Sequence, residues 1–146
     1  MNSQSKTLHK VVIVVPRIGL LFLGLLAAPL ASQATVVDEQ LTAYQASGAG
    51  PFSTQTGEQL WQQEVTNAKD GRARSCTTCH GRDLRRVGKH AKTGKAIEPL
   101  SPAVNAKRLS SAKKINKWLK RNCKWTWGRE CTAQEKGDLL SFIQRQ

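Results

Sequence analysis

An all-α fold in a single domain is what the sequence predicts, and three observations support it. Apolar residues recur at helical spacing in four segments, which are separated by polar or glycine- and proline-containing links. The chain has 146 residues, a length that leaves no room for a two-domain enzyme once an N-terminal leader is subtracted. Aromatic residues make up only 5% of the sequence, so few large apolar side chains are available to fill a core between the helices. We therefore expect something other than side chains to occupy part of the interior.

Residues 1–34 have the organisation of a secretory signal peptide. A polar start with two lysines precedes a nearly continuous apolar run over 18–31. Small residues stand where a signal peptidase requires them, so we expect cleavage after Ala34, export to the periplasm and a mature domain of residues 35–146. An uncleaved membrane anchor is the alternative, because residues 11–31 have about the 20 residues that a membrane helix needs. A proline and an arginine split that run, which favours cleavage.

The mature domain is strongly basic. The full chain carries 23 Lys and Arg against 10 Asp and Glu, a formal net charge of +13. Three of the basic residues and none of the acidic ones fall in the leader, so most of this charge stays with residues 35–146. Such a surface suits an acidic partner protein. A nucleic acid partner would rest on net charge alone and is opposed by export, so we expect none.

Two helices are expected ahead of the first cysteines. Residues 37–47 place two apolar side chains at helical spacing and end at a Gly-Ala-Gly-Pro breaker. Residues 57–65 carry one apolar stripe, which includes Trp61 and Val65, with an acidic residue near its start. A polar link over residues 67–75 then leads into the cysteines.

The sequence Cys76-Thr77-Thr78-Cys79-His80 is a C-x-x-C-H motif, the signature of covalent c-type haem attachment. Two intervening residues let one tight turn present both thiols to the vinyl groups along one haem edge. The residue that follows is then directed at the iron from the proximal side, and an imidazole is a usual fifth ligand there. We therefore predict one haem c attached through Cys76 and Cys79, with His80 as the proximal iron ligand.

Two other kinds of site use the same cysteine spacing. A structural zinc site needs a second ligand pair of similar spacing, and Cys123 and Cys131 are too far apart in the sequence to supply it. A thioredoxin-type redox pair needs a strand-to-helix setting, whereas this motif follows a polar link and precedes a loop. Haem attachment is favoured over both, because the chain carries an export leader and predicted helices on either side of the motif.

An extended loop is predicted over residues 81–102, which contain three glycines and two prolines and have no sustained period. His90 lies within it. Imidazole is a strong iron ligand, yet most lone histidines in loops are solvated, so both interpretations of His90 stay open.

Two further helices are predicted near the C-terminus. Ser110 or Ser111 caps the first, which is amphipathic. Thr132 and Glu135 form a capping box at the start of the second. The apolar stripes of the two helices are Ile115, Trp118 and Leu119, and Leu139, Leu140 and Ile143. The rest of the first helix is basic and is either a solvated face or a docking surface; its residues are Lys113, Lys114, Lys117, Lys120 and Arg121.

The order of these elements is that of the class I cytochromes c. We therefore predict an all-α, class I cytochrome c fold, a single domain wrapped around one covalently bound haem. The class places a sixth iron ligand, usually methionine, in the half of the chain that follows the motif. Met1 is the only methionine in the sequence, so the mature chain has none to offer.

Four segments of this distal half together resemble the sphaeroides haem protein family of high-spin monohaem cytochromes c. They are Thr93-Gly94-Lys95, Ile97-Glu98-Pro99-Leu100-Ser101-Pro102, Lys117-Trp118-Leu119-Lys120-Arg121-Asn122-Cys123 and Gly128-Arg129-Glu130-Cys131-Thr132. The resemblance implies Asn122 as the sixth iron ligand and a disulfide between Cys123 and Cys131. It also implies a dihaem cytochrome c and a membrane cytochrome b as redox partners. The segment Trp125-Thr126-Trp127, which we expect to be a loop, is bulkier than the family pattern.

These features predict an exported c-type cytochrome that transfers electrons and, when reduced, binds small diatomic ligands at an iron opened by loss of Asn122. A carboxamide oxygen is a hard, weak ligand that suits ferric iron better than ferrous iron. One alternative is a plain electron carrier whose haem is closed by His80 and His90. Another is a small oxidoreductase acting on oxygen or nitrogen oxides. An electron-transfer and ligand-binding haem protein is favoured over a turnover enzyme, and the sequence leaves open whether anything is turned over.

Overall fold

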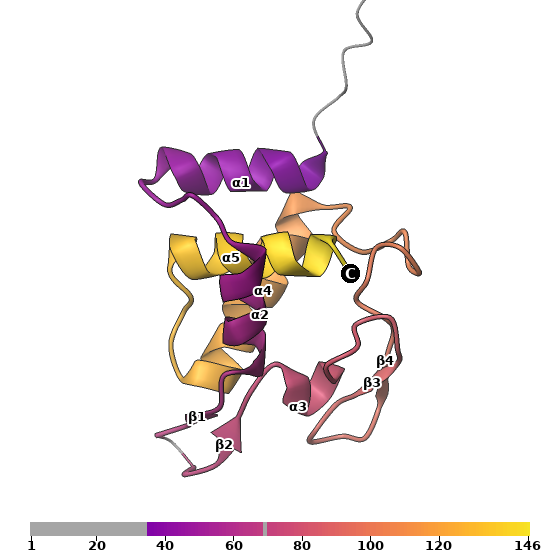
Figure 1. Ribbon diagram of the computed structural model, residues 1–146. Helices are drawn as coiled ribbons and strands as arrows, with labels where there is room; N and C mark the ends of the chain where they lie inside the picture. The colour runs from indigo at the N-terminus through magenta and orange to yellow at the C-terminus, as the bar shows by residue number, and fades with distance from the viewer. Residues whose placement is uncertain (1–34, 69) are drawn as a thin grey trace, which may run out of the picture. The chain divides into compact units, whose positions relative to one another are not determined.

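The computed structural model describes residues 35–68 and 70–146 and is mainly helical (Figure 1). The helices are α1 Val36–Ala46, α2 Thr54–Gln62, α3 Thr77–His80, α4 Ala112–Trp127 and α5 Ala133–Gln144. Two short hairpins are formed by β1 Val65–Thr66 with β2 Ala73–Arg74, and by β3 Gly88–Lys89 with β4 Ala96–Ile97. The predicted leader and its cleavage site lie outside the described residues. Within the described part of the chain, no helix is both long enough and apolar enough to cross a membrane.

Side-chain caps determine where the long helices begin. Thr35 forms a capping box with Asp38 at the start of α1, and the predicted box of Thr132 and Glu135 begins α5. Ser53 caps α2 by accepting a hydrogen bond from the Thr56 amide. This cap places α2 three residues earlier than the apolar stripe predicted.

Helices α2 and α5 cross in close contact, as Figure 1 shows near the centre of the molecule. Glycine makes this approach possible, because a Cβ added at Gly57 would lie 2.0 Å from the backbone oxygen of Asp138. The buried residues around the crossing include Trp61 and Phe142, whose ring centroids are 5.9 Å apart. Helix α1 packs on α5 and α4, and the Tyr44 hydroxyl donates to Asn116 Oδ1 at 2.9 Å.

Helix α4 is longer than predicted. It begins after Ser111, whose side chain accepts from the Lys114 amide, and continues through Trp127 to Gly128. Gly128 has a φ of 73°, the left-handed conformation that ends helices. The expectation that residues 125–127 form a loop is therefore wrong, because the helix stops at the glycine and not at the disulfide-bonded cysteine.

The two hairpins were not predicted. The first pairs Val65 with Arg74, so Val65 belongs to a strand and not to the preceding helix. The second, 88–97, lies against α3, and a Cβ added at Gly88 would come within 2.4 Å of the Cys79 carbonyl oxygen. Strands of two residues show no alternation in sequence, which explains why these segments were interpreted as a link and a loop.

Candidate haem site

A cavity of about 640 Å³ lies between α2, α3, α4, α5 and the segment that joins α3 to α4. We call it the central cavity. Its lining is mostly apolar. Every residue that the sequence analysis proposed around the iron lines it, including the alternative ligand: Cys76, Cys79, His80, His90 and Asn122. These residues, far apart in the chain, therefore meet in one place.

The C-x-x-C-H motif forms a single helical turn at the cavity. The His80 amide donates to the Cys76 carbonyl at 3.2 Å, and Gly81 ends the turn with a φ of 72°. The preceding Ser75 amide donates to the Thr78 hydroxyl at 3.0 Å, which fixes the entry into the turn. Both thiols of the motif are free and half-buried. The local geometry therefore presents two unpaired thiols and one imidazole from adjacent positions of the same turn.

Burial controls the protonation of these groups. Desolvation, and secondarily the positive charge of Arg108, lowers the pKa of His80 to about 4. Desolvation raises the pKa of the Cys76 thiol to about 12. The Trp61 ring lies 5.5 Å from the His80 ring and its indole donates to the Gly81 carbonyl at 3.0 Å. At neutral pH the His80 imidazole is uncharged, the form that binds a metal.

Arg108 is a residue of the cavity that the sequence analysis missed. Its Nε donates to the Pro99 carbonyl at 2.8 Å and a terminal nitrogen donates to the Glu98 carbonyl at 2.7 Å. The same segment is held by Leu84, whose carbonyl accepts from two amides, those of Leu100 and Ser101. A guanidinium fixed in this way favours a carboxylate-bearing group in the cavity. A single arginine between two predicted elements carries no sequence signal of that role.

Asn122 reaches the cavity from the middle of α4. Trp118 lies one turn before it on the helix and Trp125 and Thr126 lie one turn after it, and all four residues line the cavity. The Asn122 side chain is exposed and makes no hydrogen bond to the residues that the structure describes. Its carboxamide is therefore available to a group held between α3 and α4. Trp118 is 48% exposed, so it is less enclosed than a core residue.

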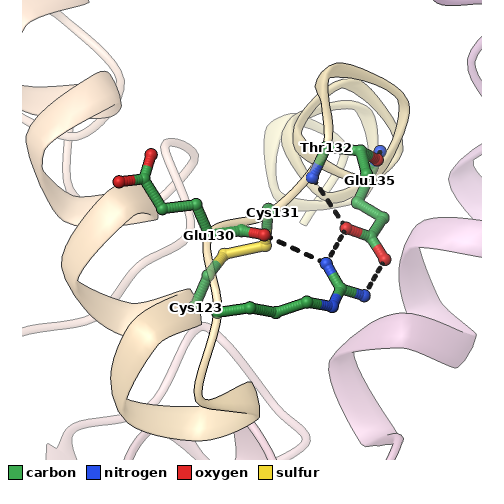
Figure 2. The surroundings of a disulfide bond; sticks show 6 residues. Cys123, Glu130, Cys131, Thr132 and Glu135 are labelled. Carbon is green, nitrogen blue, oxygen red and sulfur yellow. Dashed lines mark hydrogen bonds and ion pairs between the residues drawn. A yellow bond between two sulfur atoms is a disulfide. The ribbon is translucent and has the colours of Figure 1, made fainter.

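The predicted disulfide between Cys123 and Cys131 is present, with its Cα atoms 5.6 Å apart (Figure 2). It joins the residue after Asn122 to the residue before the Thr132 cap of α5. Because both cysteines are committed to this bond, neither is available as a zinc ligand to the cysteines of the motif. The bridge fixes the position of α4 relative to α5 beside Asn122.

The first hairpin supports the far end of α4. The Arg74 guanidinium lies 4.5 Å from the centre of the Trp125 ring and donates to the Trp125 carbonyl at 3.0 Å. The Asn67 side-chain nitrogen Nδ2 donates to the same carbonyl at 3.1 Å. These contacts tie the segment that leads into the motif to the helix that carries Asn122.

His90 lies on the second hairpin, which packs on the motif itself. The Ala91 amide donates to the Cys79 sulfur at 3.4 Å, and the Thr93 amide donates to His90 Nδ1 at 3.2 Å. His90 therefore belongs to the element that covers α3, whereas Asn122 comes from α4. Both line the cavity, so the arrangement keeps His90 as a candidate ligand.

Comparisons with known proteins agree with this arrangement. The family described as "Domain of unknown function (DUF1924)" matches residues 47–143. The chain is 36% identical over 127 residues to the cytochrome c-type protein SHP of Cereibacter sphaeroides, which covers 87% of this chain and 97% of that protein. It is also 33% identical over 73 residues to cytochrome c'' of Methylophilus methylotrophus, about half of each chain (50% and 51%).

Solved structures of the same two proteins resemble the fold of this chain. The structure of oxidised SHP, described as an oxygen-binding cytochrome c, matches with a TM-score of 0.69 and 35% identity, covering 78% of this chain and all (100%) of that one. The crystal structure of oxidised cytochrome c'' from Methylophilus methylotrophus matches with a TM-score of 0.65 and 26% identity, covering 74% and 92%. The chain thus shares its fold with these proteins.

Proposed function

The chain belongs to the DUF1924 family, is related to cytochrome c-type protein SHP, and has the class I cytochrome c fold with one covalently attached haem c. We propose that it is an exported redox protein with a gated iron. Cys76 and Cys79 hold the haem and His80 binds the iron on the proximal side. Asn122 is the distal ligand in the ferric state. Reduction releases Asn122 and opens the iron to small diatomic molecules, and the protein passes electrons to and from redox partners.

The residues around the central cavity fit a covalently bound haem. Cys76 and Cys79 are unpaired and one turn apart, His80 is neutral at physiological pH, and the lining is mostly apolar. Arg108 adds a fixed cation, which suits the carboxylates that a haem carries. When bound, the haem supplies the redox-active iron; the protein determines what approaches its distal face.

One observation carries the proposed gate: Asn122 lines the cavity from α4 and is followed by a disulfide-bonded cysteine. A carboxamide oxygen binds ferric iron better than ferrous iron, because it is a hard and weakly donating ligand. The bridge at Cys123 holds the helix in place, so a released Asn122 side chain stays close to the iron. Reoxidation then restores the bond by a side-chain movement.

The closed electron carrier is the second candidate. His90 Nδ1 accepts a hydrogen bond from the Thr93 amide at 3.2 Å and lies 3.1 Å from the Thr93 hydroxyl. These contacts hold the His90 ring on the second hairpin, whereas the Asn122 side chain makes no hydrogen bond to the described residues. This difference favours Asn122 over His90. A small oxidoreductase acting on oxygen or nitrogen oxides is a third candidate, which needs the same open iron.

The basic face of α4 is the proposed docking surface for an acidic redox partner such as a dihaem cytochrome c or a membrane cytochrome b. Lys113, Lys114 and Lys117 are exposed, and no ion pair is formed by them among the described residues. By contrast, Lys120 and Lys124 both pair with Glu130. The three unpaired lysines keep their full charge for steering a partner.

Absorption spectra of the purified protein test the proposed gate. We expect the ferrous protein to be high-spin and to bind carbon monoxide, and the ferric protein to have both axial positions filled by protein. Low-spin spectra in both oxidation states, with no response to carbon monoxide, would support the closed His80/His90 carrier. Detection of the mature chain in a periplasmic fraction, beginning at Thr35, would test export and cleavage.

A further inference from the structure

Thr126 is a buried residue of the central cavity whose hydroxyl has no partner. Its side chain is 2% exposed and it lines the cavity from the last turns of α4. No hydrogen bond joins its hydroxyl to any residue in the described part of the chain. Among the same residues, the indole nitrogen of Trp127 is the only unpaired side-chain N or O atom that protein encloses completely. The Thr126 hydroxyl is therefore unpaired but still accessible.

This arrangement is unusual for a helical threonine. A threonine within a helix commonly donates to the carbonyl four residues before it. Thr42 does so in α1, where its hydroxyl donates to the Asp38 carbonyl at 2.8 Å. Thr126 makes no such bond to the carbonyl of Asn122. The Thr126 hydroxyl faces the cavity with its donor unused, so it can donate to a group that enters the cavity.

The position of Thr126 relative to Asn122 indicates which group that is. The two residues are one helical turn apart on the same face of α4. Helical side chains point back toward the N-terminus, so the Thr126 side chain leans toward Asn122. The Arg74 and Asn67 contacts to the Trp125 carbonyl hold this turn of the helix. The Thr126 hydroxyl is held next to Asn122. It therefore borders the space that the Asn122 side chain vacates when it moves away from the iron.

We propose that Thr126 is a specificity-determining residue, whose hydroxyl donates a hydrogen bond to a dioxygen molecule bound in that space and so favours oxygen over carbon monoxide. The inference rests on the proposed function, in which reduction opens the iron. Dioxygen gains negative charge when it binds ferrous iron and becomes a good acceptor. Carbon monoxide stays almost uncharged and gains little from a hydroxyl. Trp127, the residue after Thr126, offers no equivalent donor, because its indole nitrogen is enclosed by protein.

The test compares Thr126→Val, which keeps the shape and removes the hydroxyl, with Thr126→Ser, which keeps the hydroxyl. Thr42→Val is the matched control, because it removes a threonine hydroxyl from a helix outside the cavity. Stopped-flow measurements on the ferrous protein give the dissociation rates of oxygen and carbon monoxide. We expect Thr126→Val to raise the oxygen rate by roughly fivefold to tenfold, the size of one neutral hydrogen bond. The carbon monoxide rate should stay within about twofold, and both Thr126→Ser and Thr42→Val should behave like the unaltered protein.

A second measurement reports on the hydrogen bond directly. In resonance Raman spectra of the oxygenated protein, the ligand vibration should shift between H₂O and D₂O, and Thr126→Val should abolish that shift. Equal changes in the oxygen and carbon monoxide rates would overturn the role of Thr126 while leaving the proposed gate intact. Failure of the unaltered ferrous protein to bind carbon monoxide would overturn both.

Discussion

Arg129 and Glu135 form a two-pronged ion pair, with nitrogen to oxygen distances of 2.7 and 2.6 Å, across the turn between α4 and α5 (Figure 2). Glu135 also accepts from the Thr132 amide at 2.8 Å as part of the capping box. The same arginine donates to the carbonyl of Glu130, directly before the bridged cysteine. One carboxylate therefore organises the helix start, the turn and the surroundings of the disulfide.

Acid should weaken this turn. The Arg129 guanidinium lowers the pKa of Glu135, with the capping amide contributing and partial burial opposing. A carboxyl whose pKa is lower in the folded state stabilises the fold above its unfolded pKa, and this stability is lost as pH falls through the folded pKa. We expect the midpoint of urea unfolding to decrease as the pH falls below 4.5, the ordinary pKa of a glutamate carboxyl, and to decrease less in Glu135→Gln. Glu39→Gln, at an exposed carboxyl of α1, is the control; an equal effect of the two variants would exclude a special role for Glu135.

The disulfide should contribute measurably to stability. Closing the short loop between Cys123 and Cys131 restricts the unfolded chain, which the entropy model equates with about 2.5 kcal/mol. We expect the double variant with both cysteines changed to serine to lose roughly this free energy of unfolding. Thiol titration of the denatured, unreduced holoprotein should find no free cysteine. Two free thiols would contradict the bridge.

Substitution of Asn122 should separate the two candidate ligands. Asn122→Ala should remove the distal protein ligand of the ferric state, and Asn122→His should give a low-spin iron that resists carbon monoxide, because imidazole binds both oxidation states strongly. Electron paramagnetic resonance and absorption spectra provide the measurement. A ferric spectrum that is unchanged by Asn122→Ala but altered by His90→Ala would identify His90 as the ligand instead.

Charge reversal on α4 should slow partner association. Changing Lys113, Lys114 and Lys117 to Glu should lower the on-rate with an acidic redox partner at low salt, and the difference should shrink as exposed charges are screened over about 10 Å at 0.1 M ionic strength. The control reverses three exposed arginines of equal charge elsewhere on the chain: Arg82, Arg85 and Arg86. Equal effects of the two triple variants would mean that net charge, and not this face, controls association.

The α2 and α5 crossing should not tolerate a side chain at Gly57. A Cβ there would lie 2.0 Å from a backbone oxygen of α5, which cannot rotate away as a side chain can. We expect Gly57→Ala to destabilise the fold by about 1 to 3 kcal/mol, although alanine is the better helix former. Gln59→Ala, at an exposed position of the same helix, should be nearly neutral. Thermal unfolding of the holoproteins gives the comparison.

The sequence predicted those features that have local chemical signals. The Thr132 and Glu135 box and the stripe of Leu139, Leu140 and Ile143 were predicted correctly, because each depends on residues within one or two turns. The cap of α4 was predicted at Ser110 or Ser111, and it is Ser111. The disulfide, which the family resemblance implied, is confirmed. The chemical roles of Cys76, Cys79, His80 and Asn122 stay predictions, although these residues do share one cavity.

Features set by tertiary contacts were missed. Both hairpins have strands of two residues, and their pairing is supported by contacts to α3 and α4 that no local pattern reveals. The sequence predicts that α4 ends near Cys123, whereas the helix continues to Gly128. Arg108 and Thr126 escaped notice for the same reason. A lone arginine or threonine becomes informative only when its partners, or their absence, are known.

The support of α4 around its last turns has a consequence for the speed of electron transfer. The bridge at Cys123 and the two donors on the Trp125 carbonyl restrain the backbone on the turn that follows Asn122. With the proposed ligation, a change of oxidation state then rearranges one short side chain and leaves the helix in place. Because few atoms move, the reorganisation energy is small compared with that of a protein whose backbone must shift to exchange a ligand. Electron exchange therefore stays fast.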